Sequence, residues 1–278
     1  METEVSLIIV LYKPKPEDCQ HVKLLASIYG GCIADNSPEP VFEGDKVGKM
    51  TYLWMKGNKG IAAAQNRAFE QLDGDTPYVV FLDQDSRVGE DYPLTITSAL
   101  KSLEAKGIGI LGPTLVNVEN GEAYVHSLGA DAGEGYACAR ELISSGVCIR
   151  CDVFRKIGMN DDRLFIDYVD FDMCWRASAA GYQSAVSTMI TIRHKVGNRC
   201  IVIGPYRDII SSSNRYFYQY RNMLWLLRRS YVPRMWKVKT TIKSFIRLAY
   251  LPFVGLSASA CALKGIKAGL SAPSNKTA

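Results

Sequence analysis

Apolar runs and segments of helical spacing alternate along the first third of the chain. Residues 5–12 are almost entirely apolar, which is typical of a strand buried on both faces in a parallel sheet. Residues 16–29 and 61–72 have helical spacing, and shorter strand-like runs lie at residues 32–34, at residues 51–55 and from Tyr78 onward. This alternation predicts a doubly wound α/β domain.

Beyond Asp85 the pattern loosens into shorter, glycine-rich segments. Strand-like runs at residues 107–111, 123–129 and 145–150 follow one another before the next helical segment. We therefore expect a mixed sheet in the second half of the domain.

The helix that comes next has a well-marked start. Asp167 is the expected N-cap, with Ile166 and Phe171 as a hydrophobic staple and Asp170 at the third helical position, as in a capping box. The other signals of this helix are an i,i+4 pair, Asp172 and Arg176, and a C-terminal stop at Gly181.

Charge divides the chain into two parts. Residues 209–278 contain twelve of the 33 Lys and Arg and no Asp or Glu, so residues 1–208 hold the other 21 basic residues and all 28 acidic ones. We expect an α/β domain over residues 1–208 and a basic, mostly helical C-terminal region over residues 209–278. Such a region suits an anionic membrane surface.

The membrane interpretation favours peripheral attachment. Residues 248–263 form an uncharged run of 16 that contains Pro252 and Gly255, short of the ~20 apolar residues that span a bilayer. The alternative is a solvated or oligomer-forming helical tail. No aromatic-basic binding module is recognisable, so nucleic acid is not an expected partner.

The cysteines and the first residues bear on the compartment. The opening Met-Glu-Thr-Glu-Val-Ser lacks the basic and apolar regions of a signal peptide, so a cytoplasmic protein with eight reduced thiols is expected. Cys148 and Cys151 form a C-x-x-C without a second pair. We interpret them as structural thiols rather than as a zinc site.

Candidate chemistry begins at Asp83-Gln84-Asp85, where the apolar run from Tyr78 ends. Side chains two apart on an extended segment project the same way, so the two carboxylates converge beyond the strand's carboxyl end. Open α/β sheets bind ligands at that edge. Paired carboxylates suit Mg²⁺ or Mn²⁺ together with substrate phosphates. The alternative is that both aspartates only cap a turn.

Five segments, in order, resemble the inverting, family 2 nucleotide-sugar glycosyltransferases. They are Val-Ser-Leu-Ile-Ile-Val-Leu-Tyr (5–12), Ala-Asp-Asn-Ser (34–37), Asn-Lys-Gly-Ile-Ala-Ala-Ala-Gln-Asn (58–66), Phe-Leu-Asp-Gln-Asp-Ser (81–86) and Leu-Phe-Ile-Asp-Tyr-Val-Asp-Phe-Asp-Met-Cys-Trp-Arg (164–176). The resemblance covers about residues 5–222 and is greatest to bacterial rhamnosyltransferases of O-antigen synthesis. It implies a GT-A fold, with a Rossmann-like nucleotide-binding half and a mixed central sheet.

The resemblance also implies roles for individual residues. Asp83 and Asp85 match the metal-binding Asp-x-Asp motif, and His194 resembles a later histidine that completes the metal or phosphate site; a structural role for His194 is equally open. The positions that match the nucleotide-sugar site are Tyr12, Asp35, Asn58, Gly60, Asn66 and Asp83. Asn58 can also serve as a helix N-cap.

Asp170 matches the catalytic base of the family. An inverting transfer needs one carboxylate that takes the proton of the attacking hydroxyl, and it needs no covalent nucleophile. Val169 stands where many members have Glu, which leaves Asp167 or Asp172 as helpers.

The resemblance implies transfer of L-rhamnose from dTDP-β-L-rhamnose to a polyprenyl-diphosphate-linked oligosaccharide. An acceptor of that kind lies at the cytoplasmic face of the bacterial inner membrane, where a basic tail would bind. The alternatives are another donor, such as a UDP-hexose or UDP-galactofuranose, and a catalytically silent sugar-nucleotide-binding scaffold.

Overall fold

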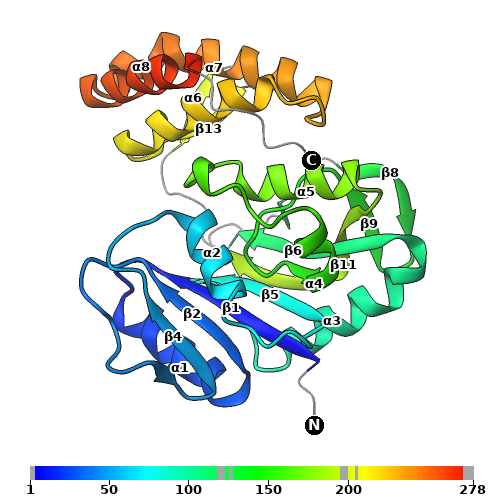
Figure 1. The fold of residues 1–278 in the computed structure, drawn as a ribbon. Helices are drawn as coiled ribbons and strands as arrows, with labels where there is room; N and C mark the ends of the chain where they lie inside the picture. The colour runs from blue at the N-terminus through cyan, green and yellow to red at the C-terminus, as the bar shows by residue number, and fades with distance from the viewer. Residues whose placement is uncertain (1–3, 118–122, 125–127, 195–199, 204–205, 272–278) are drawn as a thin grey trace.

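The computed structural model describes residues 4–117, 123–124, 128–194, 200–203 and 206–271 (Figure 1). One large mixed sheet runs in the order β3-β4-β2-β1-β5-β10-β6-β11-β9-β8, with β7 paired to β6. Its strands are β1 (Val5–Leu11), β2 (Gly31–Asp35), β3 (Lys46–Val47), β4 (Met50–Trp54), β5 (Tyr78–Asp83), β6 (Ile108–Asn117), β7 (Ala123–Tyr124), β8 (Leu128–Gly133), β9 (Tyr136–Ala139), β10 (Cys148–Arg150) and β11 (Gln183–His194).

The change from a parallel to a mixed sheet falls where the sequence predicts it. β4, β2, β1 and β5 are parallel, whereas β10 runs antiparallel to both β5 and β6. The parallel strands end together, so the carboxyl ends of β1, β2 and β5 form one edge.

Helices cover both faces of this sheet. They are α1 (Pro16–Ile28), α2 (Ile61–Phe69), α3 (Tyr92–Leu103), α4 (Cys151–Lys156) and α5 (Val169–Ala179). Alternate residues of β1 point to opposite cores: Leu7 and Ile9 pack with α1 and α3, and Ile8 and Val10 pack with α2, α4 and α5. This two-sided burial explains the continuous apolar run of β1.

Three further helices form a layer above α5: α6 (Ser213–Leu227), α7 (Arg234–Val254) and α8 (Leu256–Leu270) (Figure 1). A two-stranded sheet, β12 (Cys200–Ile203) with β13 (Tyr206–Ile209), precedes them. α6 and α8 pack closely because Gly265 lies on the backbone of α6, where an added Cβ would be 2.3 Å from the carbonyl oxygen of Phe217. Among the described residues, no helix has the length and apolarity that crossing a bilayer requires.

Buried ion pairs join this layer to the α/β domain. Arg229, just after α6, pairs with Asp161 at 2.5 Å and with Asp172 at 2.7 Å, and both carboxylates are almost fully buried. Trp175, Leu226 and Val232 form a small apolar cluster beside these pairs. The C-terminal helices therefore share a core with the α/β domain.

The predicted start of α5 is wrong in detail. The N-cap residue is Tyr168 in the left-handed conformation (φ 67°), the helix begins at Val169, and Asp170 is its second residue rather than its third. Asp167 also has a positive φ (68°) and caps nothing. The predicted pair of Asp172 and Arg176 is confirmed at 2.7 Å.

Asn58 is likewise not the N-cap of α2. That position belongs to Gly60, and the Asn58 carboxamide oxygen instead accepts a hydrogen bond from the Gly60 N–H at 2.9 Å. Cys148 and Cys151 are buried free thiols, and burial raises the pKa of each to about 12. Neither thiol has the electropositive setting of a reactive cysteine.

Candidate active site

The Asp-Gln-Asp turn follows β5 and is held by a short network of hydrogen bonds. The Asp83 N–H donates to the Ser86 hydroxyl, and the Ser86 N–H donates back to the Asp83 carbonyl, both at 3.0 Å. The Ser86 and Ser145 hydroxyls lie 2.6 Å apart, and the Gln84 side chain accepts from the Tyr12 N–H at 2.7 Å. The turn is therefore fixed to the end of β1 and to the segment before β10.

Three carboxyl groups, those of Asp83, Asp85 and Asp170, lie close enough here for their charges to interact. Burial raises the pKa of Asp83 to about 7, with further upward contributions from the charges of Asp85 and Asp170. Asp85 itself is exposed. The sheet edge thus concentrates negative charge that a cation or protons would relieve.

Asp170 lies in the first turn of α5, on the far side of this group. Burial raises its pKa to about 6, although the backbone N–H of Phe171 donates to the carboxylate at 2.9 Å and Ser144 adds a backbone hydrogen bond. The negative charge of Asp170 interacts with Arg215, which forms its ion pair with Asp167 at 2.5 Å. A carboxylate with a pKa near 6 is ionised at neutral pH and still basic enough to accept a proton.

The donor set fits a hard divalent cation at the Asp83–Asp85 turn. Two carboxylates plus phosphate and water oxygens meet the preference of Mg²⁺ or Mn²⁺. No cluster of three or more His, Cys, Asp or Glu in metal-binding geometry occurs within the described residues. His194 ends β11, where it pairs with Asn117 in the sheet, and its side chain lies outside the described residues.

Asp35 lies at the end of β2 and is fully buried. Its carboxylate accepts from the N–H groups of Ser37 (2.8 Å) and Val41 (2.9 Å) and from the Tyr52 hydroxyl (2.5 Å). These bonds shape the loop after β2 at the edge where Tyr12 ends β1. A contact between Asp35 and a nucleotide base stays a prediction.

The Asn58–Gly60 loop is tied to the same edge by a residue to which sequence reasoning gave no role. The Asn36 side chain donates to the Gly60 carbonyl and accepts from the Lys59 N–H, each at 3.1 Å. Gly60 has φ 86°, and a Cβ there would lie 2.6 Å from Phe165. The space that Gly60 leaves beside its backbone is thus filled by Phe165 of the same chain.

Three of the candidate residues are engaged in other networks. The Asn66 amide bonds Asn160 at 2.9 and 3.0 Å and also contacts Asp162. Asp172 is fully buried against Arg176, Arg229 and the Tyr231 hydroxyl, each at 2.7 Å. Asp167 pairs with Arg215. These contacts indicate that Asn66, Asp172 and Asp167 stabilise neighbouring segments rather than act directly in the reaction.

The loop before Asp170 depends on helix α6. The Asn222 amide donates to the carbonyls of Leu164, Ile166 and Asp167 at 2.8, 2.8 and 3.0 Å. Sequence reasoning missed Asn222, because an asparagine in the middle of an amphipathic helix carries no local signal of a partner 55 residues away.

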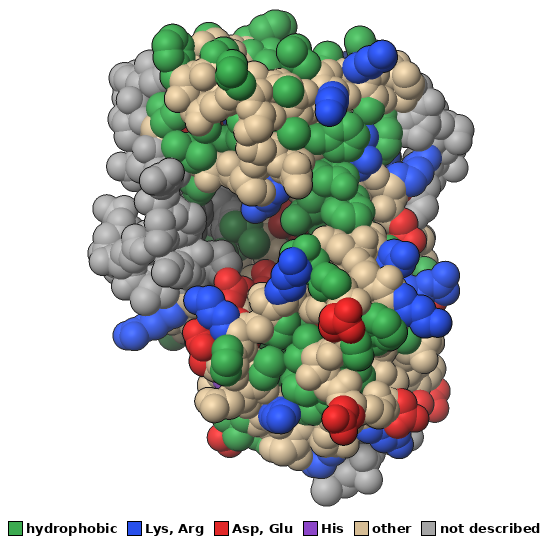
Figure 2. All heavy atoms as spheres, turned by 90° about the vertical axis from the view of Figure 1, so that its left-hand side faces the viewer, with side chains coloured by type: hydrophobic (Ala, Val, Ile, Leu, Met, Phe, Trp, Pro, Cys, Tyr) green, Lys and Arg blue, Asp and Glu red, His purple; other side chains and the backbone are tan. Residues whose placement is uncertain are grey.

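The site opens between the two parts of the molecule. Figure 2 shows a hollow between the C-terminal helices above and the α/β domain below, with acidic side chains at its lower edge. A cavity of about 520 Å³ lies between α5 and α7 and is lined by Tyr168 and Phe171, which are two residues before and one residue after Asp170. Asp170 is thus close in sequence to this cavity, and its charge also acts on Asp83 of the Asp-Gln-Asp turn.

Comparisons of the sequence agree with this geometry. The family model described as glycosyl transferase family 2 matches residues 33–142. The chain is also 26% identical over 262 residues to the dTDP-rhamnosyl transferase RfbF of Shigella flexneri, which covers 88% of this chain and 87% of the relative.

Solved structures share the fold at low identity. TarS of S. aureus matches with a TM-score of 0.57 at 14% identity, covering 97% of this chain and 81% of its own. GalNAc-T7, solved with UDP, GalNAc and Mn²⁺, matches with a TM-score of 0.56 at 12% identity, over 81% of this chain and 50% of its own. Residues 33–142 therefore carry a family 2 glycosyltransferase domain, the relative is similar along most of the chain, and the fold is the GT-A fold.

Proposed function

We propose that the protein transfers L-rhamnose, with inversion, from dTDP-β-L-rhamnose to a hydroxyl of a lipid-linked glycan. The observation that carries this proposal is the single carboxylate of Asp170, which has a pKa of about 6 and faces the charged Asp-Gln-Asp turn. An inverting transfer needs one base on the side of the sugar opposite the leaving diphosphate. The donor is proposed by analogy with the similar dTDP-rhamnosyl transferase RfbF.

In this proposal Asp83 and Asp85 hold Mg²⁺ or Mn²⁺, with the side chain of His194 as a further candidate ligand. The ion would supply Lewis-acid stabilisation of the leaving diphosphate. Burial and the neighbouring carboxylates raise the pKa of Asp83 to about 7, so the turn is prepared for positive charge. Mn²⁺ in the GalNAc-T7 structure supports a divalent ion in this fold.

Asp170 accepts the proton of the acceptor hydroxyl as that oxygen attacks the anomeric carbon. Backbone hydrogen bonds from Phe171, at 2.9 Å, and from Ser144 fix the orientation of this carboxylate. Asp167 and Asp172 act indirectly, because each is committed to arginine.

The nucleotide lies over the ends of β1 and β2 in this proposal. Tyr12 is 44% exposed there and offers its ring, and Asn58 is exposed in the loop that Asn36 holds. Asp35 and Gly60 shape the two loops, and Asn66 holds Asn160 and Asp162 from within α2.

We further propose that residues 1–208 form the catalytic domain and that residues 209–278 attach it to an anionic membrane. The attachment would be peripheral, on the cytoplasmic face of the inner membrane. Twelve basic residues without one acidic residue support this assignment. No residue of the region points to nucleic acid, and oligomer formation through the tail is the competing use.

The test is a donor screen with the purified protein and Mn²⁺. dTDP-rhamnose should be hydrolysed or transferred, and should raise the melting temperature more than UDP-glucose, UDP-N-acetylglucosamine or UDP-galactofuranose. Asp83→Ala and Asp85→Ala should abolish the donor's effect. A preference for a UDP-sugar would refute the rhamnose assignment, and donor binding without any turnover would indicate a silent scaffold.

A further inference from the structure

The cavity between α5 and α7 has a composition that the donor site does not use. Its lining contains four cations, Arg140, Lys239, Lys243 and Arg247, against two carboxylates, Glu141 and Asp208. Asp208 is neutralised within the wall, because Arg247 pairs with it at 2.5 and 2.6 Å. An excess of positive charge therefore faces the cavity.

Three of these cations are available to a ligand. Arg140, Lys239 and Lys243 are exposed at the cavity and make no ion pair or hydrogen bond with the residues that the structure describes. Both lysines project from one stretch of α7, one turn apart. Cations grouped in this way, without counter-charges, suit a ligand with several anionic oxygens, such as a diphosphate.

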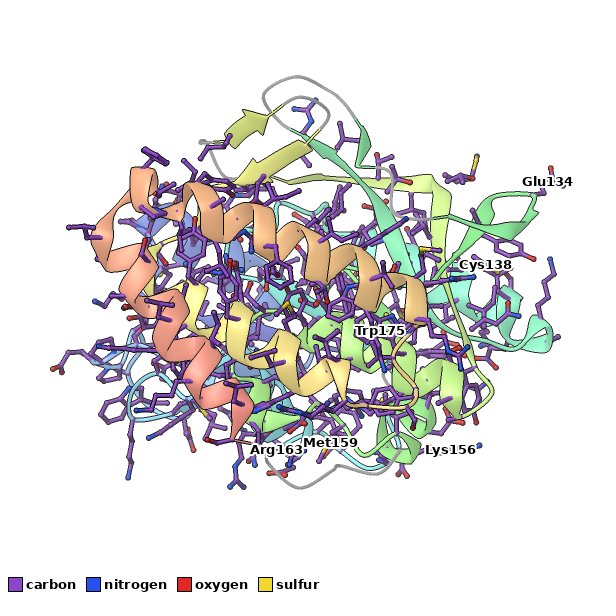
Figure 3. The ribbon with its side chains drawn as sticks, turned by 90° about the horizontal axis from the view of Figure 1, so that it is seen from above. Glu134, Cys138, Lys156, Met159, Arg163 and Trp175 are labelled. Atoms are coloured by element: carbon purple, nitrogen blue, oxygen red, sulfur yellow. The ribbon has the colours of Figure 1, made fainter. Side chains whose placement is uncertain are left out.

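Aromatic rings form the wall nearest Asp170. Trp236 packs edge-on against Tyr168 at 5.3 Å and against Trp175 at 4.7 Å, and Phe171 completes the surface. Figure 3 shows Trp175 beneath the beginning of α7. Aromatic walls with a few polar groups are typical of sites that hold a sugar ring by its C–H face.

An apolar stripe begins at the rim of the cavity. Met235, which lines the cavity, is followed along α7 by Val238, Ile242 and Phe245, and these side chains are 55–69% exposed. Since 3.6 residues make one turn, Lys239 lies between Trp236 and Ile242 around the helix axis. One helix thus carries, side by side, an aromatic face, a cationic edge and an apolar outer face.

We propose that this cavity binds the diphosphate-sugar end of a prenyl-diphosphate-linked acceptor. The diphosphate lies on Arg140, Lys239 and Lys243, the attached sugar packs on Trp236 and Tyr168, and the prenyl chain runs along the stripe from Met235 to Phe245. The growing end of the glycan then points toward Asp170. This inference rests on the proposed function for its acceptor class and assigns that acceptor a site separate from the donor diphosphate.

The test uses farnesyl diphosphate as the probe, with EDTA present to silence the metal-dependent donor site. Lys239→Ala/Lys243→Ala should weaken binding, measured by calorimetry, by about tenfold or more, because two charge-assisted contacts are lost. The matched control is Lys264→Ala/Lys267→Ala, which removes the same charge from α8 and should leave the affinity unchanged. Equal binding by wild type and both variants would overturn the proposal.

Two further probes separate the sources of the anion. Inorganic diphosphate and farnesol should each bind much more weakly than farnesyl diphosphate, since each lacks half of the ligand. If inorganic diphosphate binds as tightly, the cavity is a free-anion site and the lipid assignment fails. If the Lys239/Lys243 change reduces only the binding to phosphatidylglycerol vesicles, these lysines serve the membrane surface and the proposal is again overturned.

The outcome is independent of the donor assignment. Loss of farnesyl diphosphate binding in the Lys239/Lys243 variant together with failure of every donor would refute the proposed function alone. Unchanged binding in that variant together with normal dTDP-rhamnose turnover would refute the acceptor site alone.

Discussion

Two groups of aspartates in this protein differ in burial and in charge partners: Asp83 and Asp170 are half-buried, whereas Asp161 and Asp172 are buried. At the sheet edge, burial raises the pKa of Asp83 to about 7 and that of Asp170 to about 6. Beneath α6, burial alone would raise the pKa of Asp161 too, but hydrogen bonds and charges from Arg163 and Arg229 hold it at about 2. Asp172 belongs to the same arginine-rich group.

The difference in charge partners separates the candidate catalytic carboxylates from the carboxylates that stabilise the fold. The arginine-paired carboxylates are internally neutralised and join the C-terminal helices to the α/β domain. Among the residues that the structure describes, the carboxylates at the sheet edge have no such partners, so the folded protein holds them in an unfavourable state that a metal ion or a proton relieves. Perturbed groups of this kind cluster at active sites.

The largest effect is expected at the base. Asp170→Asn keeps the acceptor of the Phe171 N–H but cannot take a proton, so the transfer rate should fall by about 10²–10⁴-fold. Single-turnover measurements with saturating donor would report this loss, and donor affinity should be unchanged. Asp167→Asn, in which only the pair with Arg215 changes, is the control and should lose less than about tenfold. Equal losses in the two variants would contradict the assignment.

A substitution among the arginine-paired aspartates should lower the stability of the protein rather than its transfer rate. Asp172→Ala leaves Arg176 buried without a carboxylate partner and Arg229 with Asp161 alone, which should lower the free energy of unfolding by roughly 3–5 kcal/mol in urea titrations. Asp152→Ala is the matched control, because Asp152 pairs with Arg150 at the surface and such pairs contribute about 0–1 kcal/mol. A comparable loss in both variants would remove the distinction between the two groups.

In the metal-free protein, the carboxyl group of Asp83 should make stability depend on pH. Folding raises the pKa of Asp83 above its value in the unfolded chain, so the folded state binds more protons between about pH 4 and 7 and stability falls as pH rises through this window. Asp83→Asn removes that cost. Its melting temperature at pH 8 should exceed that of wild type by on the order of 5 °C, equivalent to about 2 kcal/mol.

At pH 5 the two proteins should melt within about 1–2 °C of each other, because Asp83 is then largely protonated. Mn²⁺ should raise the melting temperature of wild type at pH 8 and leave Asp83→Asn unchanged. Parallel pH profiles for the two proteins, followed by circular dichroism, would show that Asp83 bears no such cost.

The smallest effect is expected where the two regions meet. Asn222→Ala removes the donor to three carbonyls of the loop before Asp170, which should lower stability by about 1–2 kcal/mol and slow transfer several-fold without weakening donor binding. Asn214→Ala, an exposed site on the same helix, should change neither. A change in donor affinity instead of rate would show that Asn222 supports the nucleotide side.

Much of the α/β half could be predicted from local pattern. The two-sided burial of β1 and β5 requires continuous apolar runs, and the position of Asp83 at a strand end follows from where the run stops. The start of α5 could not be predicted, because Tyr168 adopts a left-handed conformation that its sequence does not favour. The packing of Phe165 against Gly60 and the bonds from Asn222 hold this loop in place.

Of the arginine-rich group, the Asp172–Arg176 pair could be predicted from the sequence, whereas the role of Arg229 could not. Arg229 reads as one more charge in a basic tail, yet it is almost fully buried between Asp161 and Asp172, which lie 68 and 57 residues earlier in the chain. Pairing across such a separation depends on tertiary packing. The basic, helical character of the tail was visible, but its folding into α6, α7 and α8, packed on one another and on the α/β domain, was not.

The bonds from Asn222 bear on how this enzyme could be re-engineered. Because α6 holds the backbone beside the base while α7 lines the cavity proposed for the acceptor, the last seventy residues are not a portable targeting tag. A hybrid that grafts them onto a similar glycosyltransferase would inherit the surface proposed to face a membrane, but its own loop would lack the matching carbonyls. Exchanging acceptor preference between relatives would therefore require moving residues 157–172 and the helices together.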